Sequence, residues 1–244
     1  MYHKKCVCEY DGSRYSGWQS QIGGNSIQQK IEAALYKLYG EKINIIGSGR
    51  TDAGVHALGQ VFSFRSEIYR ENKAVVFALN TTLPRDIGIL SSEDAPEGFH
   101  AQFDAKNKTY LYRILNRPAR AALDADRVWF RWDNIDAARL NQLLSVLKGS
   151  YDFTSFCAAE SIKENMVRTI NALTAERSGE YINIRINADC FLHNMVRIIV
   201  GTAVMLTVKG EDESCMFKIL SSKNRTAAGL TAPPYGLYLE KVNY

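Results

Sequence analysis

The stretch GSGRTDAGVHALGQ, residues 47–60, joins two segments that are predicted to be β-strands. It holds four glycines together with Arg50, Asp52 and His56. A connecting turn needs about one or two glycines, since glycine serves where the backbone turns sharply or approaches another molecule closely. Loops that leave strand ends often carry functional residues on a rigid scaffold. Two interpretations of Asp52 are open at this point: a turn residue that bonds its own backbone, or a functional carboxylate.

Predicted helices and strands surround this loop in an order that both halves of the chain share. The first half contains a strand, a helix, two strands, a helix and a strand, at 4–10, 26–40, 42–46, 60–64, 73–79 and 87–90. The second half repeats this order at 109–115, 134–149, 169–176, 181–188, 192–208 and 236–242. The first helix has a capping box at Ser26 and Gln29 and ends at Gly40, and the third is expected to be capped by Asp133 or Asn134. The order predicts two similar α+β units that share one sheet.

The composition is that of an ordinary cytoplasmic protein. The 244 residues are 46% hydrophobic, enough for a sizeable core, and the net charge of +4 is compatible with a polyanionic partner or with a plain soluble enzyme. The five cysteines form no C-x-x-C pair, so we expect reduced thiols. The longest apolar run, 198–208, is too short to span a bilayer, so no membrane association is expected. No histidine shows the spacing of a metal ligand.

One arginine interrupts the most apolar predicted helix, 192–208. Apolar residues cover almost its whole circumference, which predicts burial, yet Arg197 lies in its middle. The side chain either reaches the surface or pairs with a carboxylate from elsewhere in the chain. A loop aspartate held by Arg197 would stay ionised, because an adjacent cation lowers the pKa of a carboxyl. Such an aspartate would be a nucleophile or a stabiliser of positive charge on a sugar.

Two tyrosines alternate in the predicted strand 109–115. Tyr110 and Tyr112 point to the same face, because successive side chains of a strand alternate. Paired aromatic residues usually pack on the sheet, whereas aromatic strand residues in RNA-binding proteins stack on bases. The periodicity does not choose between the two tyrosines.

Seven segments resemble the TruA family of tRNA pseudouridine synthases, and together they cover essentially the whole chain. GSGRTDAGVHALGQV at 47–61 resembles the active-site loop of that family. The others follow in family order: EYDGSRYSGWQSQ (9–21), ALNTTLPRDI (78–87), FHAQFDAKNKTYLYRI (99–114), YDFTSF (151–156), FLHNMVRIIVG (191–201) and GLYLEKVNY (236–244). The resemblance implies an α+β pseudouridine synthase fold with a central, mostly antiparallel sheet and helices packed on it. It also implies an N-terminal half, 1–104, with the catalytic loop, and a C-terminal half, 105–244, with the substrate tyrosine and the arginine.

The resemblance further implies a reaction and roles for four residues. Asp52 is the nucleophile, Arg197 pairs with it, Tyr110 faces the target uracil, and Arg50 touches the RNA around the flipped nucleotide. The reaction converts uridine to pseudouridine at positions 38, 39 and 40 of the tRNA anticodon arm. It needs no cofactor, because nothing is oxidised and no atom is lost. Family members are homodimers, so a homodimer that binds tRNA is expected.

Two other functions compete with this one. A non-catalytic RNA-binding protein on the same fold would keep the basic and aromatic residues but would not need Asp52. An Asp/His hydrolase using Asp52 and His56 is more distant, because the sequence lacks a recognisable set of nucleophile, base and orienting group.

Overall fold

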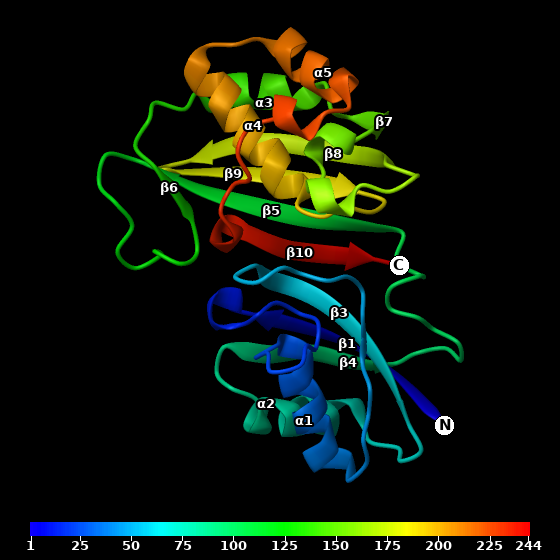
Figure 1. Ribbon diagram of the computed structural model, residues 1–244. Helices are drawn as coiled ribbons and strands as arrows, with labels where there is room; N and C mark the ends of the chain where they lie inside the picture. Colours follow the sequence, from blue (N-terminus) through cyan, green and yellow to red (C-terminus); the bar gives the residue numbers. More distant parts are fainter. The chain divides into compact units, whose positions relative to one another are not determined.

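Two α+β units make up the chain in the computed structural model, which describes residues 1–244 (Figure 1). One unit consists of Met1–Lys106 together with Tyr238–Tyr244, and the other of Asn107–Leu237. Each has a mostly antiparallel sheet with helices packed on it, which confirms the predicted fold class. None of the helices combines the length and the apolar character needed to cross a bilayer.

The sheet of the first unit has β1 (Tyr2–Tyr10) at its centre. β1 pairs antiparallel with β4 (Ile87–Asp94) on one side and with β3 (His56–Ser66) on the other. The last strand, β10 (Leu237–Asn243), runs parallel to β3, and the two-residue β2 (Ile46–Gly47) also pairs with β3. Strand β10 therefore completes the sheet that carries the loop of Asp52.

Helix α1 (Ile27–Tyr39) packs on the face of this sheet formed by alternate residues of β1 and β3. Cys6 lies opposite Phe62 in the register, and the rings of Tyr39 and Phe64 meet with centroids 5.8 Å apart. The predicted capping box is confirmed, since the Ser26 hydroxyl accepts from the Gln29 backbone and the Gln29 side chain accepts from the Ser26 backbone. The helix ends at Gly40, whose φ of 72° is left-handed.

Helix α2 (Asn72–Thr82) protects the edge strand β4. The Asn80 amide accepts the N–H of Ile89 at 2.7 Å and donates to its carbonyl at 2.9 Å. One side chain thus takes the place of a neighbouring strand, which removes a site for edge-to-edge pairing.

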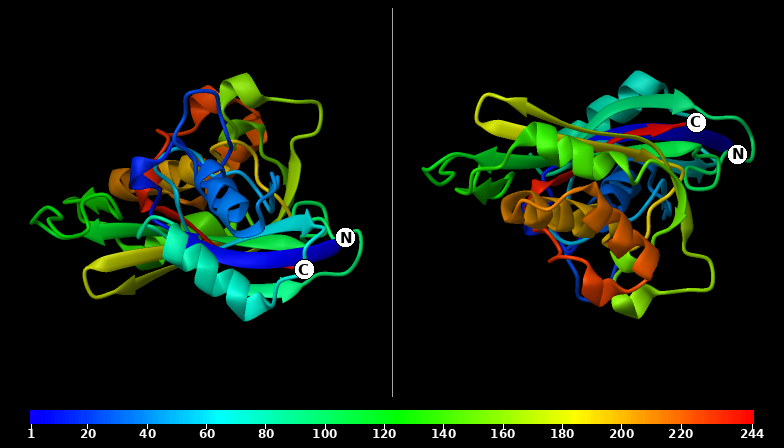
Figure 2. Two further views of the ribbon diagram at one scale, coloured as in Figure 1. Left: turned by 90° about the horizontal axis from the view of Figure 1, so that it is seen from below. Right: turned by 90° about the horizontal axis from the view of Figure 1, so that it is seen from above.

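The second unit has four antiparallel strands in the order β5 (Asn107–Asn116), β9 (Tyr181–Ala188), β8 (Val167–Ser178) and β7 (Gly149–Asp152). The short β6 (Trp129–Arg131) runs parallel to β5. Three helices lie together on one face of this sheet: α3 (Ala137–Ser145), α4 (Met195–Lys209) and α5 (Glu213–Ser222) (Figures 1 and 2). That face carries Tyr112 and Ile184, which pair across the strands and are fully buried.

Three sequence predictions are wrong in their boundaries. Of the predicted strand 42–46, only Ile46 pairs with β3, together with Gly47 just beyond it, because the N–H of Ile45 donates to the Glu32 side chain of α1 at 3.1 Å. Helix α3 is capped by Asp136, not by Asp133 or Asn134, because the Asp136 carboxylate accepts the N–H of Ala138 at 2.8 Å.

Helix α4 starts later than predicted. Its first residue is Met195, since the preceding Asn194 is left-handed with φ 62°. Arg197 therefore lies in the first turn of the helix and not in its middle. Helix α5, which the sequence pattern did not predict, follows after a turn capped by Asp212.

Candidate active site

The loop that carries Asp52, residues 47–55, is anchored to β3 by one glutamine. The Ser48 hydroxyl donates to Gln60 Oε1 at 2.6 Å, and Gln60 Nε2 donates to the carbonyl of Gly49 at 2.9 Å. The Ser48 N–H donates to the carbonyl of Val61 at 2.7 Å. Ser48 and Gln60 are both fully buried, so this anchor is shielded from water. The first half of the loop is therefore rigid.

The second half of the loop is held by the segment 10–18. The Tyr10 hydroxyl and Thr51 Oγ1 are 2.7 Å apart, and the Trp18 N–H donates to the Thr51 carbonyl at 3.0 Å. Two glycines allow this approach. A side chain at Gly17, whose φ is +98°, would lie 2.5 Å from the Thr51 carbonyl oxygen, and one at Gly12 would overlap the carbonyl of Val55. Backbone therefore packs on backbone around Asp52.

Asp52 lies half-buried at the start of a turn within this loop. The N–H of Val55 donates to the Asp52 backbone carbonyl at 3.1 Å, and Gly54 takes a left-handed conformation with φ +77°. These backbone features close the turn. Arg50, two residues earlier, is exposed.

His56 follows the loop and is a packed residue. Its ring is 2% exposed and stacks on Tyr238 with centroids 4.7 Å apart. Its Nδ1 accepts the N–H of Gly12 at 3.0 Å and lies 3.3 Å from Asp11 Oδ1. Because this lone pair is engaged by a backbone amide, the geometry argues against His56 as the base of a hydrolase.

The two tyrosines of β5 differ in what they contact. Tyr112 is fully buried, and its hydroxyl donates to the Pro233 carbonyl at 2.8 Å. Burial raises the pKa of Tyr112 well above its usual range, so this hydroxyl stays protonated and continues to donate. Tyr110 meets the ring of Phe191 edge-on, with centroids 4.9 Å apart. Tyr112 is thus committed to the core, whereas Tyr110 contacts the segment that leads into α4.

Arg197 is half-buried and is fixed by two acceptors of its own unit. Its Nη1 donates to Asn194 Oδ1 and its Nε to the carbonyl of Ala232, both at 2.7 Å. Ala232 belongs to segment 229–236, which comes after α5 in the chain. The N–H of Ala232 donates to the Arg197 carbonyl at 3.1 Å, and the N–H of Gly229 donates to Thr202 Oγ1 at 2.9 Å. The guanidinium is therefore oriented before any ligand is bound.

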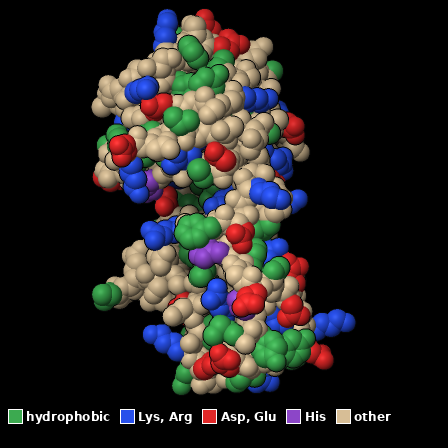
Figure 3. All heavy atoms as spheres, turned by 90° about the vertical axis from the view of Figure 1, so that its right-hand side faces the viewer, with side chains coloured by type: hydrophobic (Ala, Val, Ile, Leu, Met, Phe, Trp, Pro, Cys, Tyr) green, Lys and Arg blue, Asp and Glu red, His purple; other side chains and the backbone are tan.

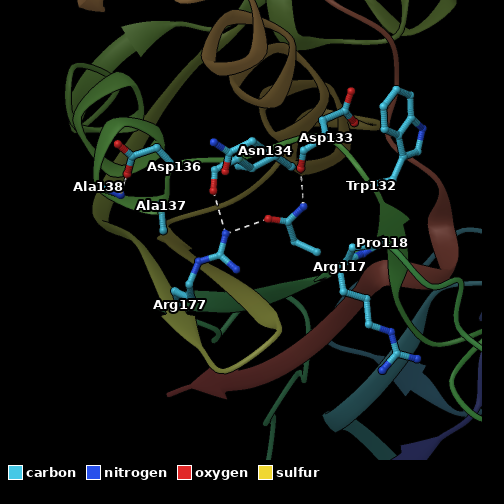
Figure 4. A pocket seen from close by; sticks show the side chains of 11 residues that line it. Arg117, Pro118, Trp132, Asp133, Asn134, Asp136, Ala137, Ala138 and Arg177 are labelled. Carbon is cyan, nitrogen blue, oxygen red and sulfur yellow. Dashed lines mark hydrogen bonds between the residues drawn. The ribbon is translucent and has the colours of Figure 1, made fainter.

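One hollow of the second unit does not coincide with this site. It encloses about 650 Å³ near the start of α3, and none of the four predicted site residues lines it. In Figure 4 the Arg177 side chain crosses it, and Arg177 Nη2 donates to Asn116 Oδ1 and to the carbonyl of Ile135, both at 2.7 Å. These hydrogen bonds join strands to the α3 entry, which is a structural role.

On the face drawn in Figure 3, lysine and arginine side chains lie among acidic ones and do not gather into one basic patch. No group of three or more His, Cys, Asp or Glu side chains is placed to hold a metal ion. All five cysteines are free thiols, as the sequence predicted.

Asp52 and Arg50 thus share one loop of the first unit, and Tyr110 and Arg197 lie in the second. Sequence reasoning missed the residues that hold them in place, above all Asn194, Thr51 and Gln60. A close backbone approach is predicted only for the glycines of 47–60, whereas the structure also places one at Gly12 and one at Gly17.

A family model described as tRNA pseudouridine synthase matches residues 7–104 and 144–244, which include Asp52 and Arg197. The chain is similar to the tRNA pseudouridine synthase A of Thermoanaerobacter sp. (strain X514), with 42% identity over 238 residues and 98% of each chain covered. It is also similar to the proteins of that name from Anaplasma marginale (strain Florida) and Wolbachia pipientis wMel. Both are 43% identical to it, with 98% of this chain and 99% of the relative covered.

Proposed function

Because the chain belongs to the tRNA pseudouridine synthase family, we propose that it converts uridine to pseudouridine at positions 38, 39 and 40 in the anticodon arm of tRNAs. The observation that carries this proposal is the similarity along nearly the whole chain to tRNA pseudouridine synthases, which includes the loop of Asp52. The enzyme is an isomerase: the N1–C1′ bond breaks, C5 joins C1′, the hydrogen of C5 leaves as a proton, and N1 takes up a proton.

Asp52 is the nucleophile of this reaction. Its carboxylate adds to the base or to the sugar and so divides one difficult step into two easier ones. The rigid loop supports this role, since a nucleophile on a fixed backbone loses little entropy when it reacts. Tyr110 stacks on the detached uracil and holds it while it turns, which a base in a flipped-out pocket requires. Arg50 contacts the RNA around that nucleotide.

Arg197 pairs with Asp52 in this proposal. A guanidinium beside a carboxylate favours the ionised form, which is the form that attacks. The two hydrogen bonds that orient Arg197 within its own unit support the assignment, because they fix the direction of its planar fork.

The remaining parts of the proposal concern partners and location. The protein acts on tRNA in the cytoplasm, without a cofactor, as a homodimer. Light scattering of the purified protein, alone and with tRNA, tests the dimer: a strictly monomeric protein that binds tRNA at full strength contradicts it.

The test of function is Asp52→Asn, which keeps the size of the side chain and removes the ionised oxygen. We expect a folded variant that binds unmodified tRNA and releases no tritium from C5-labelled uridine, whereas the wild type releases it. Asp212→Asn is the matched control, because Asp212 is an exposed helix cap and asparagine caps a helix about as well.

Two outcomes point elsewhere. A wild-type protein that binds tRNA but forms no pseudouridine would favour the non-catalytic RNA-binding function. Release at the wild-type rate by both Asp52→Asn and Asp52→Ala would remove Asp52 from the chemistry.

A further inference from the structure

Asn194 has a backbone conformation that its place in the chain does not explain. It is the residue before α4 and, with Lys223, one of two non-glycine residues with positive φ. Residues that cap the start of a helix usually have extended backbones and accept one of the free N–H groups with their side chains. Asp136 and Asp212 do this for α3 and α5. Asn194 has φ 62° and makes no such cap.

The side chain of Asn194 is used for Arg197 instead. Asn194 Oδ1 accepts from Arg197 Nη1 at 2.7 Å. Residues three apart are neighbours on one helix face, so the left-handed turn places the amide beside the first-turn guanidinium. If backbone shape alone mattered here, glycine would adopt the left-handed conformation without steric cost. The hydrogen bond of the amide to Arg197 therefore explains why asparagine and not glycine stands at this position.

The acceptor is also neutral. A carboxylate at position 194 would cancel the charge of Arg197, whereas an amide oxygen orients the guanidinium and leaves its positive charge for an anionic partner. The Ala232 carbonyl, which accepts from Nε, is neutral as well. Both acceptors thus fix the direction of the fork without neutralising it.

We propose that Asn194 is a positioning residue of the reaction: its side chain does not cap the helix but orients the Arg197 guanidinium toward Asp52. The inference rests on the proposed function, since it requires Arg197 to act on Asp52. It assigns to Asn194 no contact with the substrate.

The experiment compares two substitutions at this position. Asn194→Gly keeps the left-handed backbone and removes the acceptor, and Asn194→Asp keeps the shape and adds a charge. We expect each to lower the single-turnover rate of pseudouridine formation by about tenfold to a hundredfold, the range for hydrogen bonds to charged groups. The Kd for tRNA and the Tm should stay near those of the wild type. Lys223→Gly, at the other left-handed position, is the control and should leave the rate unchanged.

A double-mutant comparison separates positioning from a general structural role. In an Arg197→Lys background, Asn194→Gly should have almost no further effect on the rate, because the guanidinium fork it orients is gone. An undiminished effect in that background overturns the inference, and so does a wild-type rate for either single variant. If Asn194→Gly unfolds, the Asn194→Asp arm decides, since asparagine and aspartate both tolerate this backbone. A wild-type protein that forms no pseudouridine would instead count against the proposed function.

Discussion

The substitution Tyr112→Phe removes a single oxygen atom and tests whether Tyr112 and Tyr110 of β5 have different roles. In Tyr112→Phe the buried hydroxyl that donates to the Pro233 carbonyl at 2.8 Å is lost, and the carbonyl of the half-buried Pro233 loses this donor. A typical hydrogen bond contributes about 0.5–1.5 kcal/mol net to stability. For a chain of this size each kcal/mol lowers the Tm by about 2–4 °C. We therefore expect a Tm lower by roughly 1–6 °C.

The same experiment has an activity arm. Well below its Tm, Tyr112→Phe should still form pseudouridine, because Tyr112 belongs to the core. Tyr110→Ala should lose turnover while it still binds tRNA, because the stacking surface for the uracil is gone. Thermal unfolding followed by circular dichroism and tritium release from C5 measure the two effects. The reverse result, an inactive Tyr112→Phe beside an active Tyr110→Ala, would refute this assignment of the strand.

Two further predictions concern the first unit. Gly17→Ala should lower both Tm and turnover, since its methyl group would lie 2.5 Å from the Thr51 carbonyl oxygen at a φ of +98°; Gly23→Ala, with a φ of +70° and nothing within 4 Å, is the control that carries only backbone strain. Stability should also fall at alkaline pH, because burial raises the pKa of Cys6 from 9.0 to about 12, so the unfolded chain loses this proton first. The stability that the buried Cys6 thiol contributes is fully present below pH 9, and above it the free energy of unfolding falls by about 1.4 kcal/mol per pH unit. Urea unfolding between pH 7 and about 10.5 measures this slope, and an equal slope in Cys6→Ala would contradict the cause.

Local signals explain which parts of the fold could be predicted. The ends of α1 followed from Ser26, Gln29 and Gly40, because a capping box and a left-handed stop act within one helical turn. The strand predicted at 42–46 failed for the opposite reason. Ile43 and Ile45 are buried as an alternating strand requires, but a glutamate thirteen residues earlier takes the N–H of Ile45. No local pattern indicates such a contact.

The same distinction applies to the candidate site. Arg197 stood out in the sequence because a cation is costly in an apolar helix, and Asp52 stood out because its loop resembles a family motif. Asn194 could not be recognised, since asparagine before a helix normally predicts a cap. The left-handed turn that changes its role depends on how segment 191–197 packs.

The supports of the two candidate catalytic groups share one physical feature, which is that they rely on backbone atoms. The Asp52 loop is held through the Thr51 carbonyl and by the approach of Gly12 and Gly17, and Arg197 through the Ala232 carbonyl. A backbone acceptor remains after its own side chain is substituted, so most changes in these supporting segments should be tolerated. A glycine at a close approach has no such freedom, because any side chain displaces the backbone that it contacts. Mutations that impair the site from outside it should therefore concentrate at glycines, and Asn194 and Gln60 are exceptions because their amide side chains are themselves acceptors.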